Sequence, residues 1–132
     1  DVLQYDTPEE MFYHPLSKPV ADYMGQSNYI AGVVKDGKFT CPAVSFETEM
    51  EDGEYELMVR PSAVNLNHAS DCKYEIREVL FEGETAEITL EAAGEELLVW
   101  MLHHDFAALD VKTGDKIGVL VDGKSGTLFP KQ

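Results

Sequence analysis

The spacing of apolar residues divides the chain into a short helical opening and a long series of strands. Residues 8–14 and 19–24 carry apolar side chains between capping and proline signals, which is typical of short helices. From Asn28 onward apolar and polar residues alternate with the period of two that strands require. We therefore expect two short helices followed by a mainly β domain.

The ends of the two helices are marked by specific residues. Thr7, Pro8 and Glu10 form a capping box: Thr7 caps the helix, Pro8 occupies its first position and Glu10 reaches back to the cap amide. Pro15 ends this first helix, because a residue before proline is pushed out of the helical region. Ser17 caps the second helix, and we expect Gly25 to end it in the left-handed conformation.

The strands that follow are short and separated by turns. Asp36-Gly37 and Ala93-Gly94 predict tight turns, Asn65–Asp71 predicts a polar loop, and His103–Leu109 predicts a helical turn. Asp122-Gly123 and Gly126 predict a last hairpin. Many short strands with turns every eight to twelve residues indicate an antiparallel barrel or sandwich. The expected strands cover residues 29–35, 38–41, 43–47, 55–60, 73–82 (with a bulge before Val79), 85–92, 96–102 and 117–121.

Charge and cysteine content narrow the classes of function. The 132 residues include 25 acidic and 10 basic ones, a formal net charge of −15, which repels nucleic acid and anionic lipid. No apolar run approaches the roughly 20 residues that span a bilayer, and no secretory signal precedes the first helix. We interpret Cys41 and Cys72 as thiols in a reducing compartment, with a single disulfide as the alternative.

Candidate chemistry is sparse. The phosphate loop, the dinucleotide fingerprint, the nucleophile elbow and the HExxH zinc motif are all missing from the sequence. His103 and His104 have side chains that suit a metal ion, but adjacent strand residues point to opposite faces of a sheet. We therefore favour a solvated loop or strand end for both residues over a metal site. The acidic stretch 47–54 lacks the spacing of a calcium loop, and Glu87 and Glu91 share a polar strand face that we expect to be solvated.

The large aromatic residues carry open alternatives. Trp100 lies in an expected strand, where a single tryptophan belongs to the core, to a subunit interface or to a ligand platform. The same three alternatives apply to Phe81, Phe106 and Phe129.

The opening of the chain resembles a known protein family. Gln4-Tyr5-Asp6-Thr7-Pro8-Glu9-Glu10-Met11-Phe12 is similar to the segment that closes the nucleotide-binding domain of ABC importer ATPases. Pro19-Val20-Ala21-Asp22-Tyr23-Met24-Gly25-Gln26-Ser27-Asn28 is similar to its continuation. Asp6 departs from the family pattern, which has glycine there.

The remainder resembles the transport-associated OB-type (TOBE) domain that follows in the same polypeptides. The resemblance rests on short motifs in the family's order, and Ser62 departs from the acidic residue usual after Arg-Pro. These motifs are Met58-Val59-Arg60-Pro61-Ser62, Val79-Leu80-Phe81-Glu82-Gly83, Thr113-Gly114-Asp115-Lys116-Ile117 and Leu128-Phe129.

The resemblance implies an OB-like antiparallel barrel (residues 28–132) preceded by the tail of a nucleotide-binding domain (residues 1–27). It implies a domain that hydrolyses nothing and binds no cofactor or metal, with ATP and magnesium held by an upstream domain. It also implies a homodimer through the accessory domain, membrane permease partners and a cytoplasmic position at the inner face of the membrane. The family-motif positions are Thr7, Pro8, Glu10, Gly25, Asn28, Arg60, Pro61, Gly83, Gly114 and Asp115, and the interface candidates are Phe81, Trp100 and Phe129.

Two roles fit that family, a passive dimerising hinge and a sensor of a small regulatory ligand. Relatives of this type serve polyamine, ferric-iron and sugar import. A free-standing ligand-binding β-barrel is the alternative from another class. A nucleic-acid-binding barrel is disfavoured because the ten basic residues are scattered.

Overall fold

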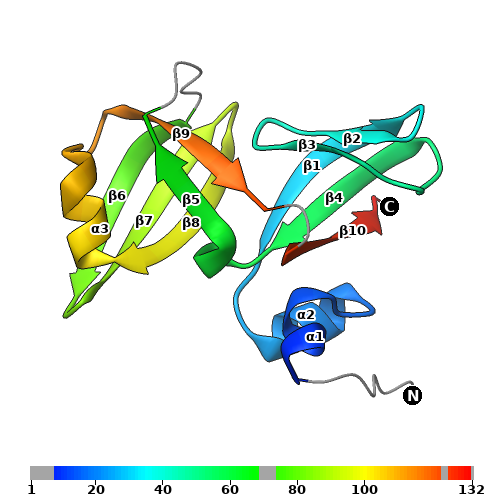
Figure 1. Cartoon of the computed structure of the whole chain (residues 1–132), viewed down its shortest axis with the longest axis horizontal. Helices are drawn as coiled ribbons and strands as arrows, with labels where there is room; N and C mark the ends of the chain where they lie inside the picture. The colour runs from blue at the N-terminus through cyan, green and yellow to red at the C-terminus, as the bar shows by residue number, and fades with distance from the viewer. Residues whose placement is uncertain (1–7, 69–73, 123–124, 132) are drawn as a thin grey trace. The chain divides into compact units, whose positions relative to one another are not determined.

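A computed structural model describes residues 8–68, 74–122 and 125–131. The chain forms two compact units (Figure 1). The first unit comprises residues 1–60 and 122–132, and the second comprises Pro61–Val121. The second unit is therefore an insertion between two segments of the first. The division at residues 27 and 28, expected from the family resemblance, stays a prediction.

The first unit combines two short helices with one antiparallel sheet. Ser17 Oγ accepts a hydrogen bond from the Val20 amide at 3.4 Å, as the predicted cap requires. Asp36 and Gly37 both have positive φ, as the predicted two-residue turn demands. The elements are α1 (Pro8–Tyr13), α2 (Lys18–Met24), β1 (Asn28–Lys35), β2 (Lys38–Thr40), β3 (Ser45–Glu47), β4 (Gly53–Val59) and β10 (Gly126–Pro130), in the sheet order β10-β4-β1-β2-β3.

The second unit is built on another five-stranded antiparallel sheet, in the order β5-β9-β6-β7-β8. Strand β7 alternates as predicted: Ala86, Ile88 and Leu90 are buried, and the residues between them are not. The predicted bulge in β6 lies between Ile76 and Glu78. The elements are η1 (Pro61–Ala63), β5 (Val64–Asn67), β6 (Tyr74–Glu82), β7 (Thr85–Ala92), β8 (Glu95–Leu102), α3 (His103–Leu109) and β9 (Lys116–Val121).

The predicted mainly β architecture with two short N-terminal helices is confirmed. Three local predictions are wrong. Residues 65–67, predicted to begin a polar loop, belong with Val64 to β5, because Val64 and Leu66 pair with Val121 and Val119 while asparagines occupy the alternate positions.

The prediction that the last two strands form a hairpin is also wrong. Both edges of β9 are already occupied, by β5 and β6, so β10 pairs with β4, where Leu128 lies opposite Leu57. Gly25 ends α2 with φ 154° and ψ −173°, which is an extended conformation of positive φ and not the left-handed helical one. Thr7 and Cys72 lie outside the described residues, and Cys41 is half-buried.

Candidate functional site

Arg60, directly after β4, is completely buried and holds the helical opening of the first unit. Its Nε donates to the Phe12 carbonyl at 2.9 Å, and its Nη1 donates to the Gly25 and Gln26 carbonyls at 3.0 Å each. Nη1 also lies 2.7 Å from Ser27 Oγ. The guanidinium carbon sits 4.2 Å from the centre of the Phe12 ring. One side chain thus ties the ends of both helices to the sheet.

The electrostatics of this cluster follow from burial. Burial lowers the pKa of Arg60, while nearby Tyr29 and Asp22 oppose that change. An arginine stays charged at neutral pH even so, because its ordinary pKa lies far above 7. Nη2 of Arg60 is the only buried side-chain nitrogen or oxygen in the described part of the chain without a hydrogen-bond partner. The direct contacts of the cation are carbonyl dipoles and an aromatic face, and the Asp22 carboxylate adds a longer-range attraction.

Two family-motif positions lie beside Arg60. A Cβ on Gly25 would lie 3.4 Å from Phe12 Cε1 and 3.8 Å from Arg60 Nη1. Asn28 is 7% exposed and pairs across the sheet with Val59, the neighbour of Arg60. The structure thus brings Gly25, Asn28 and Arg60 close together. In the sequence, Gly25 and Arg60 are 35 residues apart.

A second polar pair reinforces the contact between helix α2 and the sheet. Tyr29 donates its hydroxyl to Asp22 Oδ1 at 2.7 Å, and burial followed by this bond raises the pKa of Tyr29 to about 12. Lys18 Nζ lies 5.0 Å from the centre of the Tyr29 ring and forms an ion pair with Glu56. Sequence reasoning missed this group, because none of its members stands out by motif or period.

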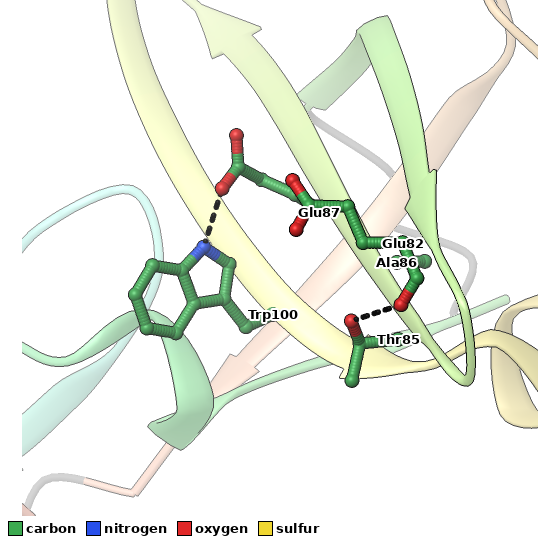
Figure 2. A pocket seen from close by; sticks show the side chains of 5 residues that line it. All are labelled: Glu82, Thr85, Ala86, Glu87 and Trp100. Atoms are coloured by element: carbon green, nitrogen blue, oxygen red, sulfur yellow. Dashed lines mark hydrogen bonds between the residues drawn. The ribbon is translucent and has the colours of Figure 1, made fainter.

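The second unit carries its chemistry on an outer sheet face. Trp100 on β8 is 41% exposed, so the core alternative for this residue is excluded. Its Nε1 donates to Glu87 Oε1 at 3.0 Å. Trp100, Glu82 and Glu87 line a hollow of about 250 Å³, together with Thr85 and Ala86 (Figure 2). An open aromatic ring beside two carboxylates is an arrangement that attracts cations.

The other aromatic candidates have different surroundings. Phe81 is 52% exposed and stacks on His103 with ring centres 4.1 Å apart. Phe106 is buried and lies near Phe81. Phe129 is 9% exposed and packs with Ala21 and Met58, so it contributes to the core of the first unit. Phe81 and Trp100 keep exposed surface, and their place in a subunit interface stays a prediction.

The remaining motif positions lie in turns or beside helix ends. Gly83 and Gly114 have φ 64° and 98°, a region that favours glycine. Asp115 Oδ2 accepts from the Lys112 amide at 3.0 Å, and the Gly114 amide donates to the Ile76 carbonyl. Gly114 and Asp115 shape the turn before β9, and Gly83 lies in the turn between β6 and β7. Pro8 and Glu10 lie in α1, and Pro61 is buried in η1.

The described ranges contain neither a cluster of residues suited to a metal ion nor a helix suited to crossing a membrane. Residues 8–68, 74–122 and 125–131 contain no group of three histidine, cysteine, aspartate or glutamate residues that could hold a metal. His103 and His104 begin helix α3. Within the same ranges no helix has the length and apolar character needed to cross a bilayer.

Comparison with known proteins supplies the context for this geometry. The chain is 27% identical over 108 residues to the Fe(3+) ions import ATP-binding protein FbpC of Vibrio cholerae, covering 75% of the chain and 30% of that protein. It is 33% identical over 103 residues to the spermidine/putrescine import ATP-binding protein PotA of Borreliella afzelii, covering 68% of the chain and 28% of that protein. The match to PotA of Clostridium acetobutylicum is 27% over 128 residues, or 89% of the chain and 34% of that protein. The chain thus spans about a third or less of these relatives.

One solved structure has a similar fold. The cytoplasmic molybdate-binding protein ModG, an OB-fold protein, superposes with a TM-score of 0.64 at 16% identity, covering 79% of this chain and 96% of that one. At this identity the likeness shows the fold alone. No family model matches the chain. The predicted OB-type fold and the predicted kinship with ABC importer ATP-binding subunits are both confirmed.

Proposed function

The chain is related to the ATP-binding subunits of ABC importers and has an OB-type, transport-associated fold. We therefore propose that it regulates such a subunit or holds two of these subunits together as a dimer. The observation that carries the proposal is the sequence match, which extends over 75% and 89% of the chain in two relatives yet occupies only about a third of each. ATP and magnesium would bind in the rest of the subunit, and this region would hydrolyse nothing itself. The imported solute would be a polyamine, ferric iron or a sugar.

Arg60 supplies a physical basis for the accessory role. The helices of residues 8–24 resemble the tail of a nucleotide-binding domain, and Arg60 fixes their ends to β4 through four short contacts. Through a rigid link of this kind, a displacement of the nucleotide-binding domain would also displace the sheet. Residues 1–27 would then belong to the ATPase domain and residues 28–132 to the accessory domain. The assembly would sit in the cytoplasm against a membrane permease.

We propose that the accessory domains form a homodimer, with Phe81 and Trp100 in or near the contact. Both are large, exposed aromatic residues, a type enriched at interfaces. Sedimentation velocity from micromolar to submillimolar concentration tests this, and we expect a dimer. A monomer at the highest concentration would contradict the dimer while leaving the accessory role intact. Turnover of ATP by the purified chain with magnesium would contradict the accessory role itself.

A ligand sensor is the second candidate, favoured by the hollow beside Trp100. A ligand that prefers one arrangement of a dimer shifts the population toward that arrangement. Thermal-shift measurements with polyamines, sugars and metal ions test it. A ligand present at a hundredfold its dissociation constant adds about 2.7 kcal/mol to stability, so the absence of any shift would contradict the sensor.

A further inference from the structure

The outer face of β6, β7 and β8 carries apolar and acidic side chains side by side. Leu80, Glu87 and Trp100 lie opposite one another in one row across the three strands. Glu82 and Leu102 belong to the next row on the same face, because side chains two positions apart point to the same side of a strand. Leu80 and Leu102 are 44% and 54% exposed, and neither glutamate forms an ion pair with any described residue. We call these five residues the acidic face.

The first unit has a hollow of complementary character. It has a volume of about 530 Å³ and lies between the start of α2 and the end of β10. The exposed apolar residues Leu16, Pro19 and Pro130 border it, together with Lys18 and Lys131. Two of the four lysines in the described part of the first unit therefore border one hollow. We call it the lysine hollow.

Both lysines of this hollow have glutamate partners but can bind further carboxylates. Lys131 Nζ lies 4.0 Å from Glu54 Oε1, and both side chains are exposed, so this pair contributes little in water. Lys18 forms an ion pair with Glu56, and its side chain is also partly exposed. An ammonium group has three donors, so each lysine can keep its glutamate and still bind a carboxylate from outside.

Charge decides how two copies of this chain can meet. Two chains that each carry a net charge of −15 repel one another as a whole. Two acidic faces placed together would add the mutual repulsion of Glu82 and Glu87 from both copies. The lysine hollow instead offers cations to these carboxylates and apolar surface to the exposed leucines. It also offers ammonium groups to the face of Trp100, a residue type that anchors interfaces.

We propose that the acidic face of one copy docks on the lysine hollow of a second copy. Trp100 enters the partner's hollow, and Glu82 and Glu87 form ion pairs with the partner's Lys18 and the partner's Lys131. When each copy uses both surfaces, two such contacts close a two-fold dimer. The inference rests on the proposed homodimer and deepens it by naming the surface that receives Trp100.

Charge reversal with rescue tests the contact in the full chain. Glu82→Lys with Glu87→Lys makes the acidic face basic, and Lys18→Glu with Lys131→Glu makes the lysine hollow acidic. In sedimentation velocity each double variant alone should associate roughly tenfold more weakly than the unaltered chain. An equimolar mixture of the two should recover the dimer, because both contacts again join opposite charges. Both variants keep a net negative charge, so general attraction between them would not produce this recovery.

Lys35→Glu with Lys38→Glu is the matched control. These lysines flank the turn between β1 and β2, and neither borders the lysine hollow. The control changes the net charge as much as the hollow variant does, and we expect it to weaken association only about twofold. Equal weakening in both variants, or a mixture that does not recover the dimer, would overturn this inference and leave the homodimer in place. A monomeric unaltered chain would contradict the homodimer and this inference together.

Zero-length cross-linking gives a reading that needs no variant. A carbodiimide joins a lysine to a carboxylate only where the two groups touch. In a mixture of isotope-labelled and unlabelled chains, links of mixed isotope composition should join Lys18 or Lys131 to Glu82 or Glu87. Mixed links confined to other residues would overturn the inference. Circular dichroism checks that the variants remain folded, and Lys131→Glu alone replaces the hollow variant if that one does not fold.

Discussion

The two units of this chain have the same kind of five-stranded antiparallel sheet but treat their charged residues in opposite ways. In the first unit a cation is buried: Arg60 lies inside, and Lys18 is partly buried against Glu56. In the second unit the described cations Arg77, Lys112 and Lys116 are all exposed. The first unit has 13 acidic and six basic residues, and the second has 12 and four, so net charge does not explain the contrast.

The difference lies in what the charges contact. In the first unit the Arg60 side chain joins the helices to a sheet, where it is shielded from solvent and its loss leaves partners unsatisfied. In the second unit the core is apolar and the charges lie on its surface, available to a ligand or another protein. Substitutions should therefore affect stability in the first unit and binding in the second.

The largest expected effect is that of Arg60→Met, which removes the buried charge but keeps most of the side-chain volume. Three carbonyls and the Ser27 hydroxyl lose a donor, so we expect the free energy of unfolding to fall by about 3–5 kcal/mol. Denaturant titration measures the loss, and hydrogen exchange should place it in α1 and α2. Arg77→Met, the exposed control, should leave the free energy of unfolding almost unchanged; equal losses would erase the contrast between the units.

Glycine substitutions give the next largest difference. A Cβ on Gly32 in β1 would lie 2.5 Å from Phe39 Cζ and from the Thr40 carbonyl oxygen, so Gly32→Ala should destabilise the chain by about 3 kcal/mol. Gly94 in the second unit has open space around it but φ 82°, so Gly94→Ala should cost about 1 kcal/mol. Thermal unfolding of both variants measures this order. A larger loss at Gly94 would mean that turn geometry outweighs packing.

A smaller effect is expected from the raised pKa of Tyr29. The folded pKa of about 12 exceeds the ordinary value of 10, so the stabilisation is complete below pH 10 and is lost as pH rises toward 12. We expect about 1 kcal/mol, because Tyr29 is only half-buried and solvent screens its interactions. The free energy of unfolding between pH 9 and 12 measures it. Tyr29→Phe should lack this component, and an identical pH profile in that variant would assign the change to other groups.

The smallest effect is expected at Trp100. Trp100→Ser removes a large side chain, yet the residue is 41% exposed and bonded only to another surface residue. The free energy of unfolding should change by no more than about 0.5 kcal/mol. A loss above about 2 kcal/mol in a denaturant titration would show that the indole supports the sheet, and the outer face would then resemble the first unit.

Sequence reasoning succeeded where one local signal decided the structure. Strand β7 was predicted to the residue, because alternation over eight positions leaves one choice of buried face. Strand β5 was missed because four residues with two asparagines give no such signal. The partner of β10 was missed because it depends on which strand edges stay open, a property of the whole sheet.

The candidate sites show the same limit. Arg60 was identified by its motif, but nothing in the sequence indicates that its partners are the Phe12, Gly25 and Gln26 carbonyls. Glu87 was expected to be solvated alongside Glu91, and the register of the sheet places it between Leu80 on β6 and Trp100 on β8. Had the register of β6 been known, the row Leu80–Glu87–Trp100 could have been written from the sequence.

The order of the strands has a consequence for how the chain is made. Strand β4 can pair with β10 only after the whole of Pro61–Val121 has been synthesised. The inserted unit is contiguous, so it is free to fold while the final strand is still within the ribosome. Closing the surrounding sheet requires a contact between distant parts of the chain, which is the slow kind of step. We therefore expect refolding to show a fast phase from the inserted unit and a slower one when the last strand docks.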